Sequence, residues 1–183
     1  MKSLSLWMIE FIRGGDYLGW MEEKRFELVP QIALSLKNIV DEKTIVLVTD
    51  KKREWFYRYA LSRLNPSTFE RPLIPIVGVE SLFMDIDTLD NKEKIDILDD
   101  MLGTIFDKGF SYFYVGDGDD KRANIAKSKR DSMLWFFDKR ESGALYLDSK
   151  ESRADIKLLE LLGLYESSIE ATLFGDIDLE GAL

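Results

Sequence analysis

The 183-residue chain contains no cysteine and no histidine, which excludes disulfides, thiolate zinc sites and catalytic triads built on either residue. Its formal net charge of −9 argues against direct nucleic-acid binding, because such proteins need a basic face to displace counterions from phosphates. A hydrophobic fraction of 45% without an apolar run of about 20 residues predicts a cytoplasmic protein with no membrane span, organised as one domain over residues 1–183.

Two helices are predicted ahead of the first strand. Apolar residues recur at helical spacing over residues 3–13, and Gly14-Gly15-Asp16 ends that helix. A second helical stretch covers residues 20–40, where Pro30 is expected to kink or split the helix. Large aromatic residues of these helices could pack on the sheet or form a subunit interface, because such residues are enriched at both places: Trp7, Phe11 and Trp20.

Strands and helices then alternate. Short apolar runs predict strands over 44–49, 72–77, 111–115 and 144–147. Pro75 lacks a ladder donor, so the second of these strands is expected to lie near an edge or to carry a bulge. The alternation predicts an α/β fold, a SIS-like or Rossmann-like three-layer sandwich. Its parallel sheet has four to five strands, with right-handed crossovers, helices on both faces and two extra N-terminal helices.

Longer periodic stretches predict helices over 51–64, 91–108 and 152–173. The first is expected to bury Trp55, Tyr59 and Leu61, or neighbouring positions. The second carries an apolar face formed by Ile95, Leu98, Leu102 and Ile105. The apolar stretch Met133–Phe137 is interpreted as a short helix that follows a basic segment, residues 120–130.

The turn Asp50-Lys51-Lys52-Arg53 follows the first predicted strand, where open α/β sheets usually bind phosphates. It has no glycine or serine that would bring backbone amides close to an anion. Asp50 would repel an anion but is well suited to capping the next helix. Capping is therefore the favoured interpretation, and an anion site is the alternative.

Acidic motifs offer weaker candidates. Gly116-Asp117-Gly118-Asp119-Asp120-Lys121 matches neither phosphate-binding fingerprint and lacks EF-hand spacing, so a turn is favoured over a Mg²⁺ or Ca²⁺ site. The pairs Asp99-Asp100 and Glu22-Glu23 could act as acids or bases only in a pocket that shifts their pKa values. The sequence shows no such pocket, so we predict no catalytic residue, no metal and no cofactor.

Leu173 and Phe174 stand at the end of the last predicted helix, before Gly175. Adjacent residues on a helix point about 100° apart, so these two side chains cannot both face the core. They could form the hydrophobic contact of the helix cap. Alternatively, they could protrude as an anchor for a protein partner. Periodicity alone favours the cap.

The segment REWFYRYALSRLNPSTFERPLIPIVG, residues 53–78, resembles the corresponding segment of the HobA family of replication-initiation regulators. Family-like stretches also occur elsewhere in the chain: LWMIEFIR, GWMEEKR, LWFF at 134–137, and DIKLLELLGLYESSIEATLF. HobA is similar in fold to DiaA and to the sugar isomerase (SIS) domain. The stretch ERPLIP resembles an ERPSLP-like stretch of DiaA.

The resemblance implies a homotetramer that binds the N-terminal domain of the initiator DnaA and promotes its assembly at the replication origin. Leu173-Phe174 matches an adjacent Leu-Phe pair implicated in the DnaA contact of DiaA-like tails, which makes the anchor the preferred interpretation. SIS enzymes hold a phosphosugar with a serine-rich loop, which is Asp50-Lys51-Lys52-Arg53 here. We therefore expect a non-catalytic adaptor. The alternatives are a SIS-type enzyme or sensor that binds a phosphosugar or nucleotide, and a structural oligomer assembled through the N-terminal aromatics.

Overall fold

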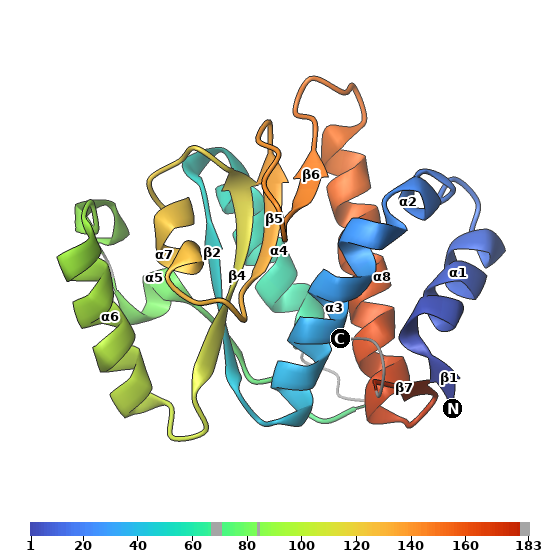
Figure 1. Cartoon of the computed structure of the whole chain (residues 1–183), viewed down its shortest axis with the longest axis horizontal. Helices are drawn as coiled ribbons and strands as arrows, with labels where there is room; N and C mark the ends of the chain where they lie inside the picture. Colours follow the sequence, from blue (N-terminus) through green and yellow to red (C-terminus); the bar gives the residue numbers. More distant parts are fainter. Residues whose placement is uncertain (67–70, 84, 180–183) are drawn as a thin grey trace.

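A five-stranded parallel sheet forms the centre of the computed structural model, which describes residues 1–66, 71–83 and 85–179 (Figure 1). The strand order is β3-β2-β4-β5-β6. The strands are β2 (Thr44–Thr49), β3 (Ile76–Gly78), β4 (Phe110–Asp117), β5 (Met133–Phe137) and β6 (Leu145–Leu147). From β2 the chain adds β3 on one side, and it then crosses over to add β4, β5 and β6 on the other side of β2. This change of side between β2 and β4 is typical of doubly wound folds. The predicted fold class is confirmed, with five strands.

Strand β3 lies at one edge of the sheet, as the position of Pro75 predicted. It is shorter than the predicted strand over 72–77, because pairing with β2 begins only at Ile76. The carbonyl of Pro75 accepts a hydrogen bond of 2.7 Å from the Ile45 amide. Proline therefore contributes its acceptor to the sheet and needs no donor there. The neighbouring residues 67–70, which belong to the family-like segment, lie outside the described residues.

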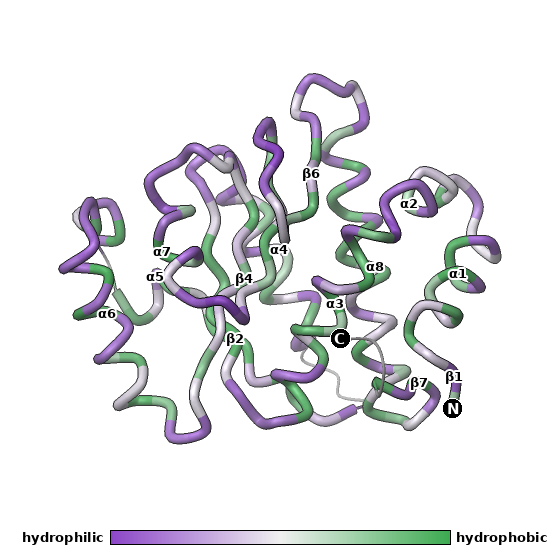
Figure 2. The backbone as a smooth tube through the Cα atoms, in the orientation of Figure 1, coloured by the Kyte–Doolittle hydropathy of each residue, from purple (hydrophilic) through white to green (hydrophobic). Residues whose placement is uncertain are grey.

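Helices cover both faces of the sheet (Figure 1). One face packs against α3 (Arg25–Val40), α4 (Glu54–Leu64) and α8 (Ala154–Leu173). The other packs against α5 (Val79–Leu82), α6 (Lys92–Ile105) and α7 (Ala123–Lys127). Side chains of one strand alternate between the two cores, since Trp135 joins the first and Phe136 the second. Figure 2 shows apolar stretches along the central strands.

Three expectations about local structure are wrong. Met133–Phe137 forms strand β5 and not a helix, because both of its faces are buried in the sheet. Trp55 and Tyr59 are exposed on α4. The buried face of α4 is formed instead by Phe56, Tyr57, Ala60 and Leu64. Ile105 at the end of α6 is also exposed.

The N-terminal helices form an extra layer beyond the sandwich. Helix α1 (Leu4–Gly14) packs on α3 and α8, and the short α2 (Trp20–Glu23) precedes α3. The predicted second helix is split at Lys24, while Pro30 lies inside α3 without interrupting it. Two short parallel strands, β1 (Lys2–Ser3) and β7 (Ile177–Asp178), join the start of the chain to the segment after α8. No helix in the described residues is long and apolar enough to cross a membrane.

Candidate functional site

The carboxyl ends of β2 and β4 meet where doubly wound folds bind their ligands. Asp50 occupies this place and is only 2% exposed. Its carboxylate accepts hydrogen bonds from the amides of Arg53 (2.9 Å) and Asp117 (2.7 Å), and it forms an ion pair with the Arg53 guanidinium. The predicted capping role of Asp50 is confirmed. The carboxylate also takes the backbone amides that a bound anion would need.

Arg53 completes this arrangement as the ion-pair partner of the carboxylate. It is 6% exposed, and its guanidinium lies 3.8 Å from the centre of the Phe137 ring. A buried cation is stable only when it is paired, and here the partner is a residue of the same turn. The term Asp50 lock is used below for the contacts among Asp50, Arg53 and the Asp117 amide.

A second buried arginine holds the neighbouring loop. The Arg122 guanidinium donates to the Thr49 carbonyl (3.1 Å) and to the Asp87 carboxylate (2.9 Å), and it lies 3.5 Å from Glu80. Lys51 also pairs with Asp87, at 2.6 Å. The hydrogen bonds from Arg122 and then Lys51 hold the pKa of Asp87 below its usual range. These ion pairs fix the segment around α5 over the end of β2. The sequence analysis did not identify them.

We expect Asp87→Asn to lower the free energy of unfolding by about 2 kcal/mol at pH 7, the value of charge-assisted hydrogen bonds to a partly buried arginine. A carboxyl with a lowered pKa stabilises the fold above its unfolded pKa, and this contribution disappears as pH falls through the folded value. The difference between variant and parent should therefore begin to shrink only below pH 3.8, the ordinary value of the carboxyl, and should be clearly smaller at pH 2. Urea unfolding at pH 7 and pH 2 measures it. An equal difference at both pH values would contradict this assignment.

The aspartates of the acidic turn after β4 bond to groups of the same chain. Asp117 accepts the Asp119 amide (2.9 Å), Asp120 accepts the Arg122 amide (2.8 Å), and Asp119 pairs with Lys139 (2.6 Å). A Cβ atom on Gly116 would lie 2.5 Å from the Tyr114 hydroxyl, so side chains fill the space beneath the turn. The described residues contain no group of three or more acidic side chains placed to hold a metal ion. The turn interpretation is favoured.

The paired acids also have structural partners. Asp99 accepts a 2.6 Å hydrogen bond from the Tyr112 hydroxyl. Burial, followed by this contact with Asp99, raises the pKa of Tyr112 above its usual range. Glu22 pairs with Arg13 at 2.6 Å on the surface. Asp99 and Glu22, the first acid of each pair, therefore each have a structural partner, and their positions need no role in acid/base catalysis.

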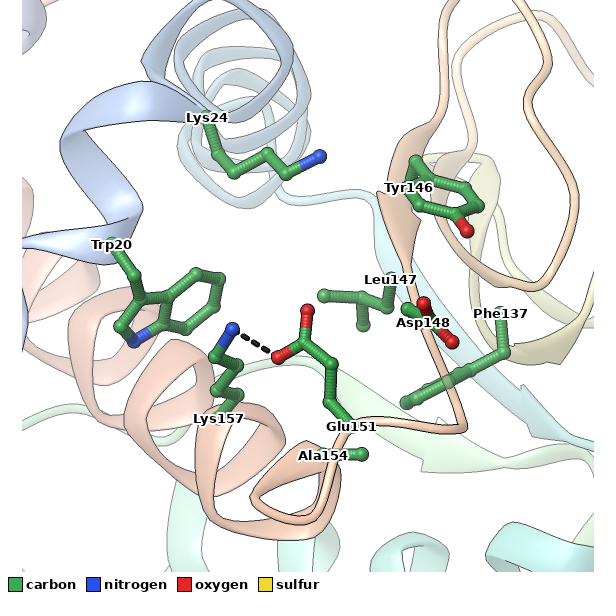
Figure 3. Close-up of a pocket in the computed structure, with 9 residues that line it drawn as sticks. All are labelled: Trp20, Lys24, Phe137, Tyr146, Leu147, Asp148, Glu151, Ala154 and Lys157. Atoms are coloured by element: carbon green, nitrogen blue, oxygen red, sulfur yellow. Dashed lines mark hydrogen bonds and ion pairs between the residues drawn. The ribbon is translucent and has the colours of Figure 1, made fainter.

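A small cavity lies between α2, β6 and the start of α8 (Figure 3). Its volume of about 40 Å³ is close to the space one water molecule occupies, and far below that of a sugar phosphate. Lys157 pairs with Glu151 at its rim, and Lys24 lies 5.0 Å from the centre of the Tyr146 ring. Its charged groups are therefore already partnered within the chain.

The N-terminal aromatics pack within their own chain. Trp7 and Phe11 stack at 5.2 Å between ring centres, and both are half-buried against the first core. Trp20 donates a 2.7 Å hydrogen bond to Glu160 on α8. Trp7 and Phe11 belong to α1, which packs on α3 and α8, whereas Trp20 on α2 lines a cavity together with Tyr146 and Leu147 of β6. Their role in a subunit interface stays a prediction.

Leu173 and Phe174 stand exposed at the end of α8, with 37% and 64% of their surfaces accessible. The helix is capped by its backbone alone. The Asp176 amide donates to the Ala171 carbonyl (2.7 Å), the Gly175 amide donates to the Thr172 carbonyl, and Gly175 has φ of 81°. In such a Schellman cap the accompanying side-chain contact joins the residues at 171 and 176. The cap therefore does not require Leu173 or Phe174, which argues against the capping alternative.

These features define a doubly wound α/β protein in which the chain's own carboxylate fills the usual ligand position and an apolar pair protrudes from the last helix. The family model described as HobA, a DNA replication regulator, matches residues 1–179, and the chain belongs to this family.

Individual members of the HobA family are also similar to this chain. The DNA replication regulator protein HobA of Helicobacter pylori is 27% identical over 188 residues, covering 98% of this chain and 100% of that protein. Two crystal structures from the same organism, HobA and a complex of HobA with DnaA (domain I–II), each match with a TM-score of 0.74 and 26% identity. Each match covers 97% of this chain and 99% of the other. The predicted family is confirmed.

Proposed function

We propose that the chain is an adaptor that binds the N-terminal domain of the initiator DnaA and promotes DnaA assembly at the replication origin. The observation that carries this proposal is the match over 97% of the chain to a HobA solved in complex with DnaA (domain I–II). The net charge of −9 suits a protein partner and leaves DNA contact to DnaA.

The same proposal makes the adaptor non-catalytic. Its support is the Asp50 lock, in which a buried carboxylate holds the amides that would bind a phosphate. The alternative, an enzyme or sensor for a phosphosugar or nucleotide, would need Asp50 to leave this position. The lock and the ion pairs of Arg122 both oppose that movement.

Leu173 and Phe174 are proposed as the anchor for DnaA. Their support is their exposure on a helix end whose cap does not require them. Side chains around them are held in place by ion pairs, since Arg71 lies 3.4 Å from Glu170 and Arg63 lies 2.7 Å from Glu166. These ion pairs lie one and two turns before the apolar pair on α8, and an apolar or aromatic anchor with polar neighbours is a typical arrangement of an interface hot spot.

Assembly of several DnaA molecules requires more than one binding site, so we propose that the chain forms a homotetramer. Once one DnaA domain is bound, tethering raises the effective concentration of the next. A tetramer with dihedral symmetry needs at least two different self-complementary surfaces. The partly exposed Trp7, Phe11 and Trp20 are proposed as one of them.

Size-exclusion chromatography with light scattering tests this function, on the chain alone and mixed with the isolated N-terminal domain of DnaA. We expect a tetramer that takes up several DnaA domains. An oligomer that does not co-elute with DnaA would contradict the adaptor. A rise in melting temperature with sugar phosphates would instead support the enzyme or sensor, because a ligand that binds only the folded state stabilises it.

A further inference from the structure

The turn that follows the proposed DnaA anchor is held by a distant segment of the chain. Residues 2–3 of β1 pair in parallel with residues 177–178 of β7. The Lys2 amide also donates a 2.9 Å hydrogen bond to the carbonyl of Asp176, just after the turn that carries Phe174. Figure 1 shows the two strands side by side at the end of α8. These contacts are called the β1–β7 clamp below.

Both strands of the clamp are fixed to the first core. Ile177 is 3% exposed, and Leu4, which follows β1 directly, is completely buried in the same core. Ser3 begins α1, because its hydroxyl accepts a hydrogen bond of 3.4 Å from the Leu6 amide. Leu179 packs against the core just after β7. The clamp is therefore a firm attachment for the turn and not a contact between two loose segments.

Asp176 connects the clamp to the helix. Its amide donates to the Ala171 carbonyl (2.7 Å) within the cap of α8, and its carbonyl accepts from the Lys2 amide. Gly175, with φ of 81°, turns the chain between Phe174 and this residue. The turn that carries Phe174 is thus attached to the helix on one side and to β1 on the other. A binding group is effective when supporting contacts hold it close to the geometry that its partner needs.

We propose that the backbone of Lys2 is a positioning element for the DnaA anchor, so that β1 fixes the direction in which Leu173 and Phe174 point at the end of α8. The inference rests on the proposed function, because it assumes that these two side chains bind DnaA. Without the hydrogen bond from Lys2, the cap of α8 still forms. The Asp176 carbonyl then loses its partner in β1, and the Phe174 side chain samples several directions instead of one.

A matched pair of substitutions separates the backbone of Lys2 from its side chain. The Lys2 ammonium pairs with Glu10 on the surface, where an ion pair contributes little to stability. Lys2→Pro and Lys2→Ala both remove this ion pair, but only proline also removes the amide donor. We expect Lys2→Pro to weaken DnaA binding about 3- to 10-fold and Lys2→Ala to change it less than about twofold. Isothermal titration calorimetry measures both affinities.

Hydrogen exchange of the chain without DnaA shows whether the turn has become looser. Amides of residues 174–178 should exchange faster in Lys2→Pro than in Lys2→Ala, because this segment has lost one attachment. Amides in the largely buried middle of α8, residues 161–169, should exchange at the same rate in both variants. Light scattering should give the two variants the same mass.

A disulfide across the clamp provides the opposite test. Ser3 and Asp178 are register partners, and the chain has no cysteine of its own. Neighbouring strands lie about 4.8 Å apart, within the Cα spacing that a disulfide can span. In the Lys2→Pro chain, Ser3→Cys/Asp178→Cys should therefore form this bond. The oxidised form should bind DnaA as tightly as Lys2→Ala does, and the reduced form should bind it more weakly. Because both forms carry the same substitutions, their comparison isolates the effect of closing the clamp.

The positioning role would be overturned if Lys2→Pro and Lys2→Ala bound DnaA equally well, or if oxidation of the double-cysteine variant did not restore binding. A lower mass for Lys2→Pro alone would also overturn it, because the loss would then lie in assembly. Failure of the parent chain to bind DnaA would instead contradict the proposed function. Faster exchange at residues 174–178 without weaker binding would contradict the positioning role and leave DnaA binding intact.

Discussion

Replacing Leu173 and Phe174 together by alanine is expected to weaken binding of the DnaA N-terminal domain by at least 30-fold, roughly 2 kcal/mol. Both side chains are exposed at the tip of α8, and a paired apolar anchor loses both its buried area and its fit to the partner when truncated. The cap of α8 consists of backbone hydrogen bonds, so the helix should remain intact. Isothermal titration calorimetry measures the change.

Ile156→Ala provides the matched control, because Ile156 is 49% exposed on the same helix but lies near its other end. It should change the affinity by less than about threefold, as most peripheral positions do. Circular dichroism and light scattering must show that the double variant keeps its melting temperature and mass. Unfolding or loss of the oligomer in that variant would assign Leu173 and Phe174 to the fold and remove them from the DnaA site.

Asp50→Ala is expected to lower the free energy of unfolding by about 3–5 kcal/mol, because it leaves the buried Arg53 guanidinium without its partner. It also removes the acceptor for the Arg53 and Asp117 amides. Urea unfolding measures the loss. The double variant Asp50→Ala/Arg53→Met should recover part of it, since the unpaired charge is then replaced by an apolar side chain.

Adding an anion tests whether the Asp50 carboxylate occupies a position that an anion could otherwise bind. The Asp50→Ala variant keeps Arg53 and two free amides at the start of a helical turn, which together favour anion binding. Inorganic phosphate should therefore raise the melting temperature of this variant more than that of the parent chain. Phosphate could instead raise the melting temperature of both proteins equally, or Asp50→Ala could lower the free energy of unfolding by less than about 1 kcal/mol. Either result would show that the Asp50 carboxylate contributes little to the turn after β2.

The buried strands are predictable from the sequence because their apolar runs are short and bounded by turns. The helix predicted over Met133–Phe137 is wrong because a run of five apolar residues carries no period that separates a strand from a buried helix. In α4, six of the seven residues from Trp55 to Leu61 are apolar or aromatic, so the pattern cannot select the buried face. The contacts of α4 with β2 and β3 determine which face is buried, and they leave Trp55 and Tyr59 exposed to solvent.

The site was predictable only where its contacts are local. The capping role of Asp50 follows from its position before a helical turn, and its partner Arg53 lies three residues away. Its bond to the Asp117 amide spans 67 residues and depends on β2 and β4 lying side by side. The bond from Arg122 to Thr49 depends on the same pairing. No spacing in the sequence reveals such contacts.

The cap at the end of α8 also has an entropic consequence. Gly175 adopts a left-handed conformation that fixes the direction of the chain, and the pairing of β7 with β1 holds the next residues in place. The backbone on both sides of Phe174 is thus ordered before any partner arrives. A partner at this tip has only two side chains to immobilise, at about 0.5–1.5 kcal/mol each, and avoids the larger cost of folding a flexible segment on contact.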